Sequence, residues 1–166
     1  MKLSKRLQTI ADFVKKNSVV ADIGTDHAHI PIYLIENNII DKAYACDINK
    51  GPLEKAKENI ENFGVSENIV LRLSNGLDKM SNKEVNTIII AGMGGELISR
   101  ILEAGYSGSH LNGRERLILQ PNVAEHFVRE WLMKHSYRIT YETVVEDNHR
   151  LYEIIVAEPA GERVEY

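Results

Sequence analysis

The feature that most restricts the fold of this sequence is an alternation of short apolar runs with longer amphipathic segments. The apolar runs have the length of buried strands, and the segments between most of them have helical spacing. Neighbouring parallel strands need a crossover of a dozen or more residues, which such helices supply. The pattern therefore predicts an α/β fold with a mostly parallel sheet. We expect the first five strands at 18–24, 43–47, 69–73, 85–91 and 116–119.

The end of the chain breaks this alternation. Two more strand candidates, 138–145 and 151–157, are separated only by the polar turn 146–150, which is too short for a crossover. They are predicted to form an antiparallel hairpin. We expect a three-layer sandwich around a mostly parallel seven-stranded sheet with this hairpin at its C-terminal end. This arrangement resembles the Rossmann-like class I methyltransferase fold, whereas an ordinary dinucleotide-binding fold keeps its strands parallel.

The domain organisation follows from the same pattern. Leu3, Leu7, Ile10 and Val14 recur at helical steps, which predicts an N-terminal helix within residues 1–17. The remaining residues 18–160 are expected to form one methyltransferase-like domain, with the tail 158–166 as its end. A length of 166 residues with 43% hydrophobic and 27% charged residues fits one globular domain and excludes disordered, collagen-like and coiled-coil classes.

Composition also bears on the compartment and the partners. The chain has one cysteine, no signal-peptide pattern and no apolar stretch of membrane-spanning length, so we expect a cytoplasmic protein that does not enter a membrane. The net charge of −4 and the pI near 5.9 do not by themselves indicate a nucleic-acid binder, although a local basic patch would suffice for one.

Acidic residues surround the first strand-to-helix loop. Asp22, Gly24 and Asp26 occupy the position where a pyrophosphate site would carry G-x-G-x-x-G, and only one of those glycines is present. Two carboxylates would repel a diphosphate but attract a cation such as the sulfonium and ammonium groups of S-adenosylmethionine. The alternative is that Asp22 or Asp26 caps the helix that begins near Pro31.

The next two loops carry groups that suit a nucleoside. Asp47 lies 23 residues after Gly24, at the end of the second strand, where a carboxylate accepts hydrogen bonds from both ribose hydroxyls. Asn75 and Gly76 follow the third strand and either contact an adenine edge or simply form a tight turn.

The fourth loop, Gly92-Met93-Gly94-Gly95, is rich in glycine. It predicts a cleft bounded by backbone, which lets a flat ring approach a methyl donor; the alternative is an anion nest or a helix-start turn without a substrate. Methyltransferases for exocyclic amines commonly carry Asp or Asn, two prolines and an aromatic residue here. That motif is absent, which favours a ring nitrogen as the methyl acceptor.

Four segments of the sequence resemble the bacterial TrmK family over nearly the whole chain. They are Lys2-Leu3-Ser4-Lys5-Arg6-Leu7, Ala21-Asp22-Ile23-Gly24-Thr25-Asp26-His27-Ala28, Ala91-Gly92-Met93-Gly94-Gly95 and Arg116-Leu117-Ile118-Leu119-Gln120-Pro121-Asn122. Members of this family use S-adenosylmethionine to methylate N1 of the adenine at position 22 in the tRNA D-loop. The resemblance implies a cofactor pocket lined by Asp22, Gly24, Asp47, Ile48, Asn75, Gly76, Gly92, Met93, Gly94 and Gly95. It places Asp26, His27 and His29 on the substrate side as catalytic candidates.

The sequence departs from the family at two points. His29 stands where relatives often carry Tyr, and longer members continue into a helical coiled-coil region that this sequence, ending at Tyr166, does not include. The resemblance also implies an electropositive tRNA surface, for which the candidates are Lys2, Lys5, Arg6, Lys15, Lys16, Arg114, Arg129, Lys134 and Arg150.

Other functions remain open at this level. The alternatives are a methyltransferase for another RNA base or a small molecule, and a nonenzymatic RNA-binding module on the same fold. Cys46 is predicted to be a small core residue. The histidines outside the first loop lack metal-ligand spacing, so no metal site is expected. The oligomeric state is left open.

Overall fold

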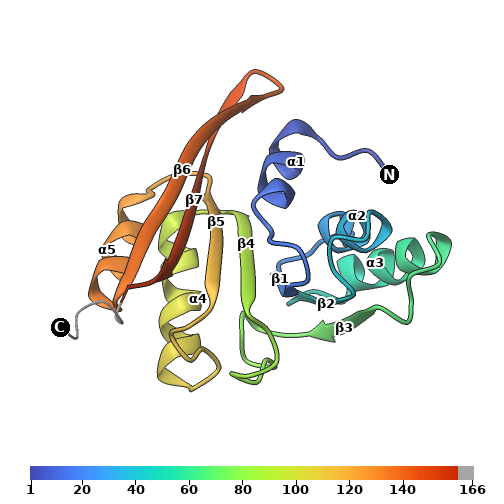
Figure 1. The fold of residues 1–166 in the computed structure, drawn as a ribbon, viewed down its shortest axis with the longest axis horizontal. Helices are drawn as coiled ribbons and strands as arrows, with labels where there is room; N and C mark the ends of the chain where they lie inside the picture. The colour runs from blue at the N-terminus through green and yellow to red at the C-terminus, as the bar shows by residue number, and fades with distance from the viewer. Residues whose placement is uncertain (161–166) are drawn as a thin grey trace.

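The computed structural model describes residues 1–160, so the predicted tail beyond residue 160 lies outside the described residues. Strands and helices alternate from β1 to β5 except between β3 and β4, which a loop without a helix connects (Figure 1). The strands are β1 (Val19–Ile23), β2 (Lys42–Asp47), β3 (Ile69–Leu73), β4 (Thr87–Met93), β5 (Arg116–Pro121), β6 (Tyr137–Asp147) and β7 (Arg150–Pro159). The helices are α1 (Lys5–Asp12), α2 (His29–Glu36), α3 (Lys50–Asn62), α4 (Gly95–Ser107) and α5 (His126–Lys134).

All seven strands form one sheet, in the order β3-β2-β1-β4-β5-β7-β6. The first five strands pair in parallel, and β7 pairs antiparallel with both β5 and β6, so the predicted C-terminal hairpin is confirmed. The strand order reverses between β1 and β4, because β2 and β3 follow on one side of β1 whereas β4 and β5 lie on its other side. In open α/β sheets this reversal opens a crevice for ligands.

The helices form the two outer layers of the sandwich. Helices α1, α2 and α3 cover one face of the sheet, and α4 and α5 cover the other (Figure 1). Ile32 and Leu34 of α2 and Ile98 and Leu102 of α4 are all fully buried. Each face therefore has its own apolar core, and the sheet between them is apolar on both sides, as parallel sheets require.

The fifth helix differs from the sequence prediction. The spacing of Val123, Phe127 and Trp131 predicts a helix with these three residues on its inner face, but the Val123 side chain is 66% exposed and α5 begins only at His126. The main chain before α5 instead satisfies an amide at the N-terminus of α4, because the Val123 carbonyl accepts a hydrogen bond from the Gly95 amide at 2.8 Å. Trp131 is buried as expected, together with Val128 and Leu132.

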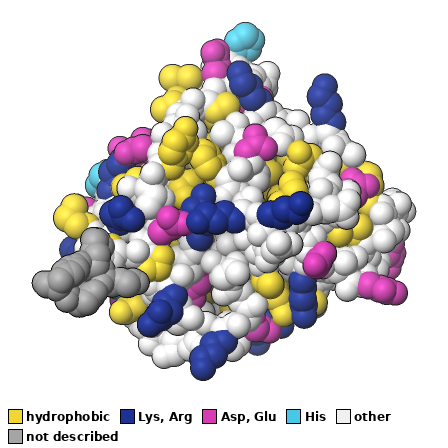
Figure 2. Space-filling view, viewed as in Figure 1, with side chains coloured by type: hydrophobic (Ala, Val, Ile, Leu, Met, Phe, Trp, Pro, Cys, Tyr) yellow, Lys and Arg dark blue, Asp and Glu magenta, His cyan; other side chains and the backbone are white. Residues whose placement is uncertain are grey.

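On the face seen in Figure 2, Lys and Arg side chains are interspersed with Asp, Glu and hydrophobic groups. Within residues 1–160, none of the helices has the length and apolarity to cross a membrane.

Candidate active site

A cavity of about 490 Å³ opens at the carboxyl ends of β1, β2 and β4. The segments that follow β1, β2, β3 and β4 are distant in sequence and meet there, as expected for the reversal point of the sheet. The cavity contains most of the residues that the sequence predicted for cofactor and substrate: Asp22, Gly24, Asp26, His27, His29, Asp47, Ile48, Asn75, Gly76, Gly92 and Met93.

Asp22 is the buried acid of this cavity, with 5% of its surface exposed. Its Oδ2 accepts a hydrogen bond from Thr25 Oγ1 at 2.9 Å. Burial raises the pKa of Asp22 to about 7; the Thr25 bond opposes this rise, and the charges of Asp47 and Asp26 add to it. A cation bound here would favour the ionised form.

Neither aspartate caps a helix, so that alternative is wrong. The N-cap of α2 is Ala28, in the left-handed conformation, and no side chain bonds the helix terminus. The Asp22 carboxylate instead points to Thr25, and Asp26 lies two residues before the cap. Both carboxylates are therefore available to the cavity that they line.

Asp47 is fixed by main-chain donors at the end of β2. Its Oδ2 accepts from the Asp26 amide at 3.0 Å, and its Oδ1 accepts from the Asn49 amide at 3.1 Å. The carboxylate therefore has one orientation and keeps further lone pairs toward the cavity. A carboxylate held in this way can accept hydrogen bonds from a pair of ribose hydroxyls.

Two glycines let main chain approach the cavity closely. Gly24 has φ +76°, and a Cβ there would stand 2.5 Å from the Met93 Cε atom. Gly92 has φ +80° and lies in a bulge where the register of β4 against β5 shifts between Ala91 and Met93. A larger residue at either position would be strained and would narrow the space for a ligand.

Gly94 and Gly95 lie outside the cavity lining, unlike Gly92 and Met93. Gly94 is the N-cap of α4, and a Cβ on Gly95 would stand 2.0 Å from the Ala124 carbonyl oxygen. This half of the glycine loop therefore serves the helix start, which is the alternative interpretation of the motif. The other half borders the cleft.

The three polar side chains that the sequence predicted for the substrate side lie together in the cavity wall. Asp26 has φ 58°, in the left-handed region, and its Oδ1 lies 3.8 Å from His27 Nε2, beyond hydrogen-bond length. The His27 and His29 rings meet edge to face at 5.6 Å. Burial, followed by the neighbouring His27, lowers the pKa of His29, which favours a neutral imidazole.

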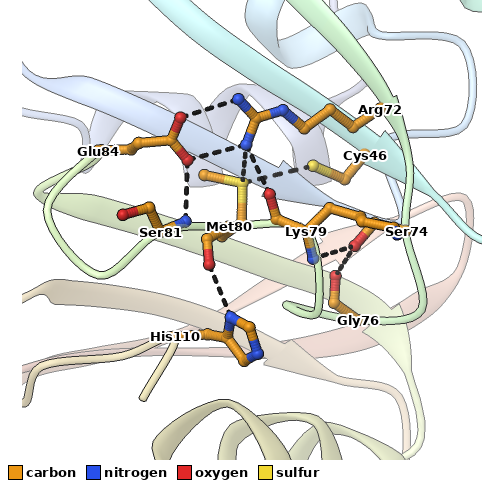
Figure 3. A network of polar contacts seen from close by, with 9 residues as sticks. All are labelled: Cys46, Arg72, Ser74, Gly76, Lys79, Met80, Ser81, Glu84 and His110. Atoms are coloured by element: carbon orange, nitrogen blue, oxygen red, sulfur yellow. Dashed lines mark hydrogen bonds and ion pairs between the residues drawn. The ribbon is translucent and has the colours of Figure 1, made fainter. Parts of the chain in front are cut away.

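A network of polar contacts holds the loop after β3 (Figure 3). Nη1 and Nη2 of Arg72 each donate to Glu84 at 2.8 Å, and Nη1 also donates to the Lys79 carbonyl. Ser74 Oγ donates to the Gly76 carbonyl at 2.8 Å. The segment at Gly76, with φ 61°, is thus a tight turn, and Asn75 and Gly76 also line the cavity; a contact with an adenine edge stays a prediction.

Sequence reasoning missed several residues of this wall. They are Arg6, Leu7, Ile23, Thr25, Ile30, Asn49, Pro52, Ser74, Ala91, Leu97 and Ile101. Arg6 was considered only as a surface cation, and its approach to the cavity depends on the packing of α1 against distant elements. Some of the others, Thr25 and Ser74 among them, stand next to predicted residues, so inspecting whole loops would have found them.

Other candidate chemistries find no support in this region. Cys46 is fully buried, and burial raises the pKa of its thiol to about 12, which confirms it as a core residue. Among the described residues, no three His, Cys, Asp or Glu side chains gather in a geometry able to hold a metal ion.

Comparison with known proteins identifies the family. Residues 3–155 match the family model described as a methyltransferase domain. The chain is 45% identical over 163 residues to the tRNA (adenine(22)-N(1))-methyltransferase of Bacillus subtilis, covering 98% of this chain and 67% of that protein. The chain belongs to the TrmK family. The resemblance stated from the sequence motifs is thereby confirmed.

Solved structures of TrmK proteins agree with this assignment. The crystal structure of B. subtilis TrmK superposes with a TM-score of 0.92 at 46% identity, covering 98% of this chain and 68% of that one. A Streptococcus pneumoniae protein described as a putative tRNA (m1A22) methyltransferase, solved with S-adenosyl-L-methionine, gives 0.90 at 42% identity, covering 96% and 74%. The class I methyltransferase fold of this chain is therefore established.

Proposed function

We propose that this protein transfers a methyl group from S-adenosylmethionine to N1 of the adenine at position 22 in the D-loop of tRNA. The observation that carries the proposal is the acidic cavity at the reversal point of the sheet, in a chain whose B. subtilis relative is named for this reaction. The lining fits the cofactor, because buried Asp22 faces a ligand with two positive groups and Asp47 offers fixed acceptors to a ribose.

The cofactor supplies an electrophilic methyl group on a sulfonium when it is bound. Asp22 would hold its ammonium end, Asp47 would accept from its ribose hydroxyls, and the turn at Asn75 and Gly76 would border its adenine. Gly24 and Gly92 would add no side chain of their own to the wall beside the methyl-bearing centre. Catalysis comes chiefly from holding donor and acceptor in line, which converts a bimolecular encounter into an intramolecular step.

On the substrate side, the attacking N1 gains positive charge as the new bond to carbon forms and the carbon–sulfur bond breaks. Asp26 stabilises this charge, because its carboxylate lines the cavity while 72% of the side chain remains exposed to an entering base. Neutral His29 and the adjacent His27 present ring faces and edges on which a flipped adenine can stack or bond.

The test is incubation with methyl-labelled S-adenosylmethionine and bacterial tRNA, followed by nucleoside analysis. We expect label in 1-methyladenosine, and its loss when position 22 of the tRNA is changed from adenosine to guanosine. Label in another nucleoside would identify a methyltransferase for a different base. Calorimetry distinguishes a nonenzymatic RNA-binding module, because such a module binds tRNA but not the cofactor.

A further inference from the structure

Arg6 differs in charge from the rest of the cavity wall. Within residues 1–160, it is the single Lys or Arg side chain among the lining residues, whereas three aspartates line the same space. Its Nη1 atom lies 3.7 Å from the point where a Cβ on Gly92 would stand. The guanidinium is therefore placed over the carboxyl end of β4, beside the glycine that opens the cleft.

Neutral groups hold this guanidinium in place. Nη1 donates to Gln120 Oε1 at 2.6 Å, and Gln120 is fully buried. The Gln120 amide is itself oriented, because its Nε2 donates to Asn122 Oδ1 at 3.0 Å. The Tyr152 ring centroid lies 5.2 Å from Arg6 Cζ, and the Arg6 main-chain amide donates to Asp147 Oδ2 at 3.0 Å. The side chain is thus pre-organised by contacts that leave its charge unneutralised.

Arg6 contrasts with three arginines that form ion pairs. Arg72, Arg116 and Arg129 each pair with a glutamate, but the Arg6 guanidinium forms no ion pair with any carboxylate in the described part of the chain. Its Nε and Nη2 atoms make no hydrogen bond to another described residue. A guanidinium with free donors in a fixed orientation is suited to bind an oxyanion through two parallel hydrogen bonds.

We propose that Arg6 is the oxyanion-binding residue of this cavity; the inference rests on the proposed function and extends it. Two sources supply this chemistry: the α-carboxylate of the methyl donor and a phosphate beside the target nucleotide. The donor carries two cationic groups and one anionic group, which matches aspartates and one guanidinium on the same wall. The adenine ring is not the partner, because it becomes cationic on methylation and Arg6 would oppose that charge.

The first experiment measures binding by calorimetry. Wild type, Arg6→Gln and the control Arg138→Gln are titrated with S-adenosylmethionine and with its decarboxylated form. Arg138 is exposed at the opposite end of β6 from Asp147 and does not line the cavity. If the carboxylate is the partner, wild type and Arg138→Gln prefer the intact cofactor by about tenfold or more, and Arg6→Gln loses that preference. Damage to the fold would weaken the binding of both ligands equally and leave the preference for the intact cofactor unchanged.

The second experiment measures equilibrium binding of tRNA over a range of salt concentrations. If a phosphate is the partner, Arg6→Gln lowers the slope of log K against log salt by about 0.7–0.9 relative to wild type. Arg6→Lys keeps the charge without the planar fork, so it should retain the salt slope but regain only part of any cofactor preference.

The outcomes are separable. A cofactor preference and a salt slope that are both unchanged in Arg6→Gln would overturn the inference. If the wild-type protein binds neither form of the cofactor, the proposed function fails, and the salt slope alone then decides whether Arg6 binds an oxyanion.

Discussion

At the scale of single residues, Asp22 links cofactor binding to pH. Burial raises its pKa to about 7, so the acid is mostly protonated at pH 6 and mostly ionised at pH 8. Because the bound ammonium requires the ionised form, we expect the affinity for S-adenosylmethionine to rise by up to about tenfold over this range. Calorimetry at both pH values measures it.

The matched variant is Asp22→Asn, which keeps the shape and an acceptor for Thr25. The cofactor affinity of this variant should change with pH only through titration of the ligand itself. The difference in pH response between the two proteins therefore isolates the contribution of Asp22. An equal pH response in both would remove Asp22 from the cation site.

The same acid makes the unliganded protein less stable at higher pH. The folded pKa of about 7 is above the unfolded value of 3.8, so between them the folded state binds more protons and stability falls as pH rises. We expect Asp22→Asn to have a higher melting temperature than wild type at pH 8, by several degrees, and the difference to shrink toward pH 5. Thermal unfolding at both pH values checks this sign, and a difference that grows toward pH 5 would contradict it.

Asp26 is predicted to act on the reaction rather than on the cofactor. Its side chain is mostly exposed, and only its main-chain amide, not its carboxylate, donates a hydrogen bond to Asp47. Asp26→Asn should therefore bind S-adenosylmethionine as wild type does, while its kcat with tRNA falls by about 100-fold. Single-turnover kinetics at saturating cofactor measure this, and an undiminished rate would exclude Asp26 from the mechanism.

At the scale of elements, the loop between β3 and β4 depends on the bidentate pair of Arg72 and Glu84. Arg72 holds the pKa of Glu84 at about 2, below its ordinary 4.5. The pair therefore stabilises the fold above pH 4.5, and this contribution is lost as pH falls toward 2. We expect Glu84→Gln to lower the free energy of unfolding at pH 7 by about 1–2 kcal/mol and to weaken cofactor binding.

The control for this pair is Glu58→Gln. Glu58 lies 3.9 Å from Lys55 on the exposed side of α3, and both side chains are about two thirds exposed. Removing its charge should change stability by less than about 0.5 kcal/mol and leave cofactor binding unchanged. Equal losses in the two variants, in denaturant unfolding and calorimetry, would show that the loop is not held by Arg72.

At the scale of the whole molecule, the cavity joins parts of the chain on both faces of the sheet, including Leu7 of α1 and Ile101 of α4. A ligand bound there stabilises the entire domain. S-adenosylmethionine at 100 times its Kd should increase the free energy of unfolding by about 2.7 kcal/mol, which raises the melting temperature by roughly 5–10 °C. NAD at the same concentration should not, because the diphosphate meets Asp22 and Asp26. An equal shift with NAD would indicate a dinucleotide site instead.

The sequence predicted most of this architecture because its strongest signals are local. The β3 bounds Ile69–Leu73 were predicted to the residue, and the turn 146–150 permitted only a hairpin. The predicted start of α5 at Val123 is wrong. Val123 has helical spacing from Phe127, but its carbonyl accepts a hydrogen bond from the Gly95 amide of α4. Local periodicity does not record such a contact.

The candidate site divides in the same way. By itself the sequence determined that acidic and glycine-bearing loops follow successive parallel strands, and the parallel arrangement brings those loops to one edge of the sheet. Only the tertiary structure decided that Gly95 belongs to a helix start and that Arg6, 114 residues from Gln120, reaches the cavity. The reason is physical: side-chain period and turn chemistry act between near neighbours, whereas the direction of a buried charge is set by packing between distant elements.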